Sequence, residues 1–306
     1  MKKKNKAIYL LFLMPFVYFA TACFVVWLVK TSGIYPSGSD TMYHVYRGDY
    51  VYNAIKSGNW YPLYDPAWYN GVEILRYWSP FPAYVMAFCQ YLAGGSQFGA
   101  YLFYIGGVCF LGACVWPFIG RGFNRPYLGA FIGLLWFFMP NNLCAIFIEG
   151  NLARSLSMIF LPVFIYSVYK YLYNHKLRYI PLMVFTFLLM ELCHLGYAGM
   201  VAIAVIIYGI VYIIQKGRKK AALDVVISMI FGFMLLGIWL VASLRGGITS
   251  LDNSENMANF FQNLWITINP FERLTRGFEY FYFGFATLVV IVFGILLDIR
   301  NREQAL

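Results

Sequence analysis

The chain has 306 residues, of which 61% are hydrophobic and only 12% charged, and its mean hydropathy is +0.64. Soluble domains carry about 25% charged residues, so this composition excludes a water-soluble globular protein and a disordered chain. The long apolar runs exclude an outer-membrane barrel, whose strands alternate apolar and polar residues. The net charge is +10, but the basic residues do not form a patch interleaved with aromatic residues on a predicted soluble surface, which argues against nucleic acid as a partner. The sequence therefore predicts an all-α, multi-pass membrane protein with membrane lipid around it.

The first predicted element is a membrane-spanning helix. Four lysines lie within the first six residues, and an uncharged run extends from Ala7 to Val29. As a helix this run would measure about 35 Å, which is enough to cross a hydrocarbon core of about 30 Å. Because basic flanks remain in the cytoplasm, we expect the N-terminus to be cytoplasmic and the helix to cross outward.

A long first outer loop, residues 30–96, is predicted next. Twelve of the fifty residues in 30–79 are Tyr or Trp, which favour the membrane interface. Ser39 or Asp40 is suited to cap an interfacial helix that ends at Gly58. The stretch 80–93 is apolar but too short to cross, so we expect it to lie in the interface or to be half inserted.

Seven further spans bring the predicted total to eight, within a single membrane domain of residues 1–306. Residues 244–279 form a second outer loop before the last span. The chain ends nine residues after that span, so we expect a truncated protein or a minimal core. The approximate limits of the seven spans are 98–119, 127–147, 153–173, 179–194, 197–214, 221–243 and 280–297, and Pro140-Asn141-Asn142 interrupts the second of them near its outer end.

Charge asymmetry supports this topology. It assigns fifteen basic and three acidic residues to the inner face, a net charge of +12, against eight basic and ten acidic residues outside, a net −2. If 80–93 crossed the membrane fully, the basic clusters at 121–125 and 216–220 would move outside, against the positive-inside rule. We therefore expect a plasma-membrane protein with both termini in the cytoplasm.

The outer loop carries the first group of candidate catalytic residues. Asp40, His44 and Arg47 are spaced four and three residues apart, so on a helix they share one face. Asp40 could act as a general base or hold a divalent cation, His44 could share the proton or that cation, and Arg47 could pair with a phosphate. The alternative is a capping aspartate at the start of a solvated helix face.

An aromatic stretch follows in the same loop. Trp68 and Asn70 precede a glycine turn, and Tyr77 precedes the sequence Trp-Ser-Pro-Phe-Pro. Aromatic rings with a glycine turn and two prolines are typical of a rigid loop with a stacking surface for a ring or an isoprenoid chain. The alternative is an anchor at the membrane interface.

Two further pairs of polar residues lie at the predicted outer ends of spans. Glu149 and Arg154 are five residues apart and could form an ion pair across the break between two spans. Glu191 and His194 are three apart, on one helical face, and could line an outer cavity. The alternatives are a purely structural ion pair and a histidine satisfied at the interface.

These motifs resemble a family of bacterial membrane proteins labelled as having a 6-pyruvoyl-tetrahydropterin synthase-related domain. The shared features are Gly38-Ser-Asp40-Thr-x-x-His44 after a first span, Trp68-Tyr-Asn70-Gly71, and an aromatic-proline stretch. The label does not indicate pterin chemistry. The order of Glu149 before and Arg154 after Gly150-Asn151 departs from the family pattern, which often has a basic residue before and an acidic one after.

The family in turn resembles GT-C glycosyltransferases, and that resemblance implies a function. It implies a GT-C-like fold and transfer of a sugar from a polyprenyl-phosphate donor to an extracytoplasmic acceptor. Asp40 would be the general base or a metal ligand, and Arg47 or Arg154 would meet the donor phosphate. The alternative is a non-catalytic subunit that binds or moves lipid-linked glycan intermediates. A transporter is a third interpretation, although the sequence contains no internal repeat.

Overall fold

The computed structural model describes residues 2–36, 38–68, 71–76, 78–245 and 292–293. Within these ranges the protein is helical, apart from an isolated antiparallel bridge between Asp65 and Val72. The helices are α1 (Lys2–Ser32), α2 (Thr41–Lys56), α3 (Phe81–Leu92), α4 (Gln97–Gly122), α5 (Pro126–Leu135), α6 (Pro140–Leu143), α7 (Leu152–Asn174), α8 (Tyr179–Cys193), α9 (Leu195–Lys216), α10 (Lys219–Leu235) and α11 (Gly237–Arg245), with a 3-10 turn η1 (Trp136–Phe138) and a π-helical turn η2 (Cys144–Ile148).

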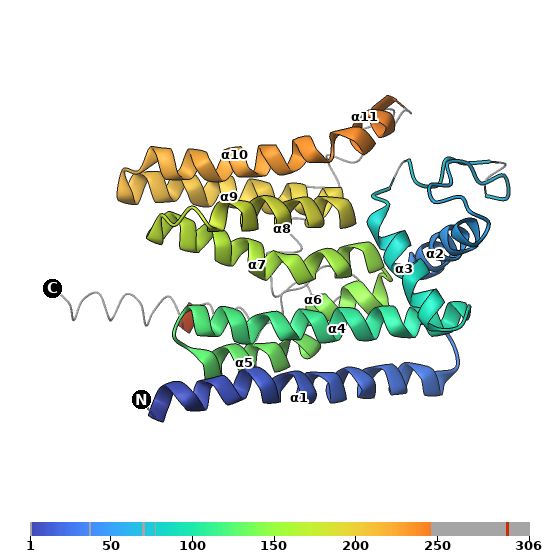
Figure 1. Ribbon diagram of the computed structural model, residues 1–306, viewed down its shortest axis with the longest axis horizontal. Helices are drawn as coiled ribbons and strands as arrows, with labels where there is room; N and C mark the ends of the chain where they lie inside the picture. The colour runs from blue at the N-terminus through green and yellow to red at the C-terminus, as the bar shows by residue number, and fades with distance from the viewer. Residues whose placement is uncertain (1, 37, 69–70, 77, 246–291, 294–306) are drawn as a thin grey trace.

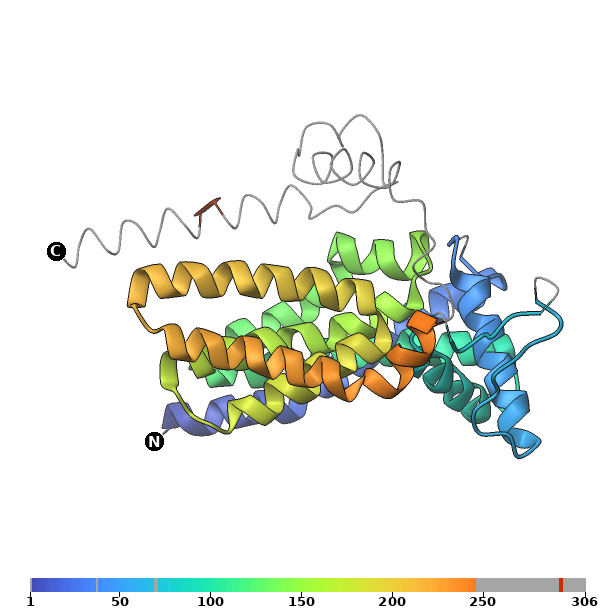
Figure 2. The same ribbon diagram turned by 90° about the horizontal axis from the view of Figure 1, so that it is seen from above.

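The long helices lie side by side along the long axis of the molecule, and α2, α3 and α11 gather at one end of it (Figures 1 and 2). This end, termed the loop end, also carries the η2–α7 connection and the α8–α9 turn. The opposite end, termed the basic end, carries the start of α1 and the α4–α5, α7–α8 and α9–α10 turns. Successive helices therefore place their polar connections at alternate ends, as membrane crossings require.

Within the described residues, four helical segments are long and apolar enough to cross a membrane, namely Leu11–Ser32, Gln97–Gly122, Leu152–Asn174 and Leu195–Lys216. Two bent pairs raise this number to six if each pair counts as one span. Helix α8 is apolar but has only 15 residues, and the predicted span 280–297 and loop 244–279 lie almost wholly outside the described residues. The multi-pass helical class is confirmed, whereas the count of eight spans stays a prediction.

The interruption predicted at Pro140 is confirmed. Met139 adopts an extended conformation (ψ 122°) before Pro140, as the residue before a proline favours, and the two parts of this span meet at 40°. The predicted span over 221–243 corresponds to α10 and α11 and is bent, because the two helices meet at 65° with the break at Leu236. Glycine at 237 weakens the helix there, and α11 is held in its new direction by the outer loop.

Among the described residues, two apolar clusters fill the bundle of long helices, and a third lies at the loop end around Val51 and Leu75. The first joins α1, α4, α5 and the start of α7, and the second joins α7, α8, α9 and α10. Phe160 of α7 and Tyr197 of α9 pack against both clusters, so the two halves form one body. The predicted helix within 80–93 is confirmed as α3, which packs against α2 and α4 at the loop end.

Candidate functional site

The site is built on a close contact between the first outer loop and the η2–α7 connection. Gly150 has a positive φ of +66°, and an added Cβ there would lie 2.1 Å from Thr41 Oγ1. A Cβ on Gly38 would lie 2.5 Å from the backbone nitrogen of Gly150. The backbone N–H of Asp40 donates to the Glu149 carbonyl at 3.0 Å, and Ser39 Oγ donates to the same oxygen at 3.1 Å. Two motifs about 110 residues apart in the chain are thereby joined backbone to backbone.

Asp40 stands at the N-cap position of α2, but its side chain makes no capping hydrogen bond. The expectation that Asp40 or Ser39 caps this helix through its side chain is therefore wrong. Ser39 Oγ lies 3.2 Å from Asp40 Oδ1 and turns toward Glu149 rather than toward the helix. Asp40 as a whole is half-buried, so part of the residue is accessible from solvent.

Glu149 and Arg154 form the predicted ion pair across the break between two spans. Arg154 Nη1 lies 2.6 Å from Glu149 Oε2, and Cys144 Sγ lies 3.3 Å from Glu149 Oε1. The Arg154 side chain is only 3% exposed. Because this guanidinium is almost fully removed from water, its charge acts strongly on groups nearby.

Asn151 and His194 cap the two helices that meet here. Asn151 Oδ1 accepts from the Arg154 N–H at 2.9 Å at the start of α7, and His194 Nδ1 accepts from the Tyr197 N–H at 3.0 Å at the start of α9. His194 Nε2 lies 3.4 Å from Asn151 Nδ2, which links the two caps. The capping role of Asn151 was not predicted, although an Asn directly before an apolar run is a signal for it.

Charges from all parts of the site act on His194. Its pKa is lowered chiefly by burial and next by the charge of Arg154, while the carboxylates of Asp40 and Glu149 raise it. His44 is buried as well, and burial, the charge of Arg47 and His194 together lower its pKa to about 3. His44 is therefore neutral at physiological pH.

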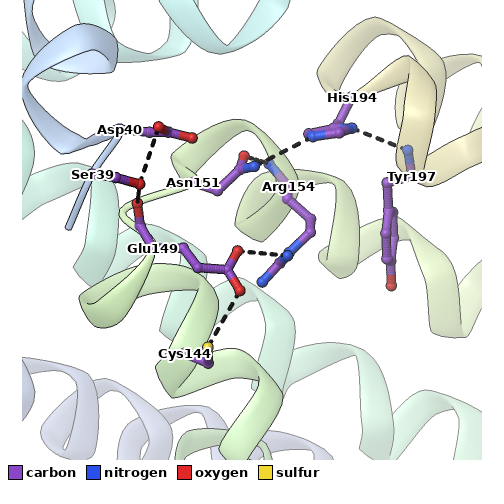
Figure 3. A network of polar contacts seen from close by, with 8 residues as sticks. All are labelled: Ser39, Asp40, Cys144, Glu149, Asn151, Arg154, His194 and Tyr197. Carbon is purple, nitrogen blue, oxygen red and sulfur yellow. Dashed lines mark hydrogen bonds and ion pairs between the residues drawn. The ribbon is translucent and has the colours of Figure 1, made fainter. Parts of the chain in front are cut away.

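Asp40, Glu149, Arg154 and His194 thus form one electrostatic unit with His44 at its edge. Figure 3 shows the contacts that run from Ser39 through Glu149 to Arg154 and from Asn151 to His194. Three segments far apart in the sequence supply these groups, and each segment places them at the loop end. The sequence could not show that they meet, because each motif alone predicts only its own helix end.

Arg47 shares the helical face of His44 but is held by the protein itself. Its Nη2 donates to the Trp78 carbonyl at 3.1 Å, and the guanidinium lies 5.3 Å from the centre of the Tyr43 ring. The Arg47 side chain is 1% exposed. It therefore fastens the 78–79 loop onto α2.

The aromatic stretch packs onto the same helix. The ring of Trp68 lies 4.4 Å from that of Tyr46 and 5.0 Å from that of Tyr43, measured between centroids. Trp68 therefore anchors its loop to α2. Asn70 and Tyr77 lie outside the described residues, so their predicted roles stay predictions.

Glu191 lies near the end of α8 and is 1% exposed. Its carbonyl accepts a hydrogen bond from Ser79 Oγ at 2.9 Å, and its Oε2 accepts none from the described residues. Within the described ranges, no three His, Cys, Asp or Glu side chains are grouped as a metal site would require. The divalent cation considered for Asp40 therefore stays a prediction.

One protein family matches this chain over residues 75–306, and its description reads "6-pyruvoyl-tetrahydropterin synthase related domain; membrane protein". The match spans about three quarters of the sequence, so the chain belongs to that family. No curated protein and no solved structure matches the chain. The matched region contains the Glu149–Arg154 pair and His194, whereas the Asp40 motif lies before it.

Proposed function

We propose that the chain is a GT-C-like membrane glycosyltransferase, which moves a sugar from a polyprenyl-phosphate donor to an acceptor outside the cytoplasm. The observation that supports it most is the meeting of Asp40, the Glu149–Arg154 pair and the two histidines at the loop end. Such a set offers a carboxylate base, a positive charge for a phosphate, and neutral imidazoles beside them.

The proposed reaction assigns one role to each group. An acceptor hydroxyl attacks the anomeric carbon of the donor, the new glycosidic bond forms, and the bond from that carbon to the phosphate oxygen breaks. Asp40 takes the hydroxyl proton, and its half-buried position leaves it accessible to do so. Arg154 stabilises the negative charge that develops on the leaving polyprenyl phosphate.

The position of the site within the molecule agrees with an outer-face reaction. The site lies at the loop end, opposite the lysine- and arginine-rich basic end. The positive-inside rule assigns the basic end to the cytoplasm and hence the loop end to the outer face. We propose a plasma-membrane location with a cytoplasmic N-terminus on this basis.

Substitution of Asp40 by Asn tests the proposal. Removing a general base lowers a rate by roughly 10²–10⁴-fold. Since the Asp40 side chain makes no capping hydrogen bond, Asp40→Asn should leave folding unchanged. The measurement is transfer of labelled sugar from a panel of polyprenyl-phosphate hexoses by the full chain in vesicles, together with its melting temperature.

Asp49→Asn is the matched control, because Asp49 lies on the same helix but contacts Gln90 Nε2 at 2.6 Å, away from the site. We expect this variant to keep its transfer activity. Wild-type transfer by Asp40→Asn would remove the main residue of the proposed mechanism.

A non-catalytic subunit that binds or moves lipid-linked glycan intermediates is the second candidate function. It is favoured by the fact that several polar groups already have partners within the protein. The guanidinium of Arg47 binds backbone carbonyls, and Glu149 and Arg154 bind each other. Binding of polyprenyl-phosphate sugars without transfer, unchanged in Asp40→Asn, would favour this function over the enzyme.

A further inference from the structure

An apolar groove lies between α9 and α10, toward the basic end of the molecule and away from the Asp40 site. Its volume is about 400 Å³, within the range of roughly 300–1,000 Å³ of small-ligand sites. Ile206, Ile210 and Leu223 form exposed walls, and Val168 and Leu172 of α7 close its floor. Gly209 leaves the groove open, because a Cβ there would meet only Ala222 Cβ, at 3.8 Å.

A polar pocket of about 530 Å³ adjoins this groove and shares Lys219 and Lys220 with it. Arg218 also lines the pocket and contacts the His175 ring. Among the described residues, the one acidic side chain that lines it is Asp224, whose carboxylate accepts a hydrogen bond from the Tyr171 hydroxyl at 2.6 Å. Three formal positive charges and one negative charge leave the pocket with a net +2.

We propose that the groove and the pocket together bind one anionic phospholipid. One acyl chain lies in the groove between α9 and α10, and the headgroup phosphate lies against Lys219, Lys220 and Arg218. Charge complementarity carries the choice of ligand, since cationic pockets between membrane helices suit anionic headgroups. A soluble anion would leave the groove unfilled, and a zwitterionic lipid would leave the net positive charge unbalanced.

The experiment measures lipid retention by the full chain. The protein is delipidated in detergent and exposed to an equal mixture of phosphatidylglycerol and phosphatidylcholine with identical acyl chains, and bound lipid is counted by native mass spectrometry. We expect wild type to retain phosphatidylglycerol in preference to phosphatidylcholine. Retention should survive inorganic phosphate, because the acyl chain contributes to binding.

Two variants distinguish the contribution of the lipid headgroup from that of the acyl chain. Lys219→Gln with Lys220→Gln should reduce phosphatidylglycerol retention about 25-fold, since each basic residue near an anionic headgroup contributes roughly fivefold. Gly209→Leu should fill the groove and reduce retention of both lipids. Lys216→Gln is the control for charge, and Gly199→Leu is the control on the same helix, because neither residue lines the groove or the pocket.

Several results would overturn the proposal. Equal retention of the two lipids by wild type would remove the headgroup preference, and displacement by phosphate alone would show that only the pocket binds. If Gly209→Leu lowers the melting temperature but leaves lipid retention unchanged, then protein and not lipid fills the groove. Lys219 and Lys220 are exposed, so their substitution should not affect folding, and it tests binding of the headgroup even if Gly209→Leu fails to fold.

Discussion

At the scale of single residues, the absence of two side chains decides where the outer loop lies. Gly38 and Gly150 approach so closely that a Cβ on either would overlap backbone or Thr41 atoms. This contact places the Asp40 backbone within hydrogen-bond distance of the Glu149 carbonyl. Any side chain at either glycine would therefore separate Asp40 from the Glu149–Arg154 pair.

Gly150→Ala should destabilise the protein more than Gly33→Ala, although both glycines have a positive φ. Gly33 has a φ of +68°, close to the +66° of Gly150, but a Cβ at Gly33 has no heavy atom within 4 Å. Both substitutions incur about 1–2 kcal/mol for the left-handed conformation, and only Gly150→Ala adds overpacking of about 1–3 kcal/mol.

The measurement is the melting temperature of each variant in detergent. Equal losses for Gly150→Ala and Gly33→Ala would show that the close contact with Thr41 contributes nothing to stability.

At the scale of elements, the bend between α10 and α11 is explained by the loop that α11 contacts. Trp239 Nε1 donates to the Leu75 carbonyl at 2.7 Å, and Arg76 Nε donates to the Ala242 carbonyl at 2.9 Å. Ser243 Oγ also donates to the Arg76 carbonyl. A straight continuation of α10 would lose these bonds, so the outer loop and α11 stabilise each other.

Trp239→Phe should weaken this contact, because it keeps an aromatic ring but leaves the carbonyl of buried Leu75 without its donor. Losing such a partner costs about 1–3 kcal/mol. We expect faster hydrogen exchange over residues 71–76 and a lower melting temperature.

Trp116→Phe is the matched control, since Trp116 Nε1 is buried and has no hydrogen-bond partner among the described residues. It removes an indole N–H that makes no bond, so its effect on stability should be smaller. A larger loss in Trp116→Phe than in Trp239→Phe would contradict the role given to the Leu75 bond.

At the scale of the whole molecule, the bundle separates charge between its two ends. The turns at the basic end carry Arg121, Arg125, Lys176, Arg178 and Arg218 among others, and the loop end carries the Asp40 and Glu149 carboxylates. The positive-inside rule predicts that the basic end lies in the cytoplasm. The same orientation would expose the proposed catalytic site to the outside and the proposed lipid site to the inner leaflet.

Cysteine labelling of intact cells checks this orientation. Ser57 at the loop end and Arg218 at the basic end are both exposed, so a thiol introduced at either position can react with a maleimide that reaches its side of the membrane. In a Cys23→Ser background, which removes the one exposed native cysteine, an impermeant maleimide should label Ser57→Cys and leave Arg218→Cys unmodified.

Permeabilised cells provide the control, because both introduced thiols should then react. Labelling of position 218 in intact cells would reverse the orientation and would place the Asp40 site on the cytoplasmic side.

Local chemistry made several features predictable from the sequence by itself. Hydrophobic runs bounded by charges predicted the positions of α1, α4, α7 and α9, because crossing a bilayer requires long apolar helices. Pro140 predicted the break in its span, and the spacing of Glu149 and Arg154 predicted their ion pair. Each of these depends on residues that are near one another in the chain.

Tertiary structure alone decided the contacts between distant segments. The spacing of Arg47 predicted that it could pair with a phosphate, but in the folded protein its guanidinium donates to the Trp78 carbonyl. The 221–243 run was apolar enough for one straight helix, but bonds to residues 75 and 76 bend its end. Asp40 and His194 come together because Gly38 contacts Gly150 and because the α8–α9 turn lies at the same end. Hydropathy predicts at which end of the helical bundle each motif lies, whereas side-chain packing determines which other motif it contacts at that end.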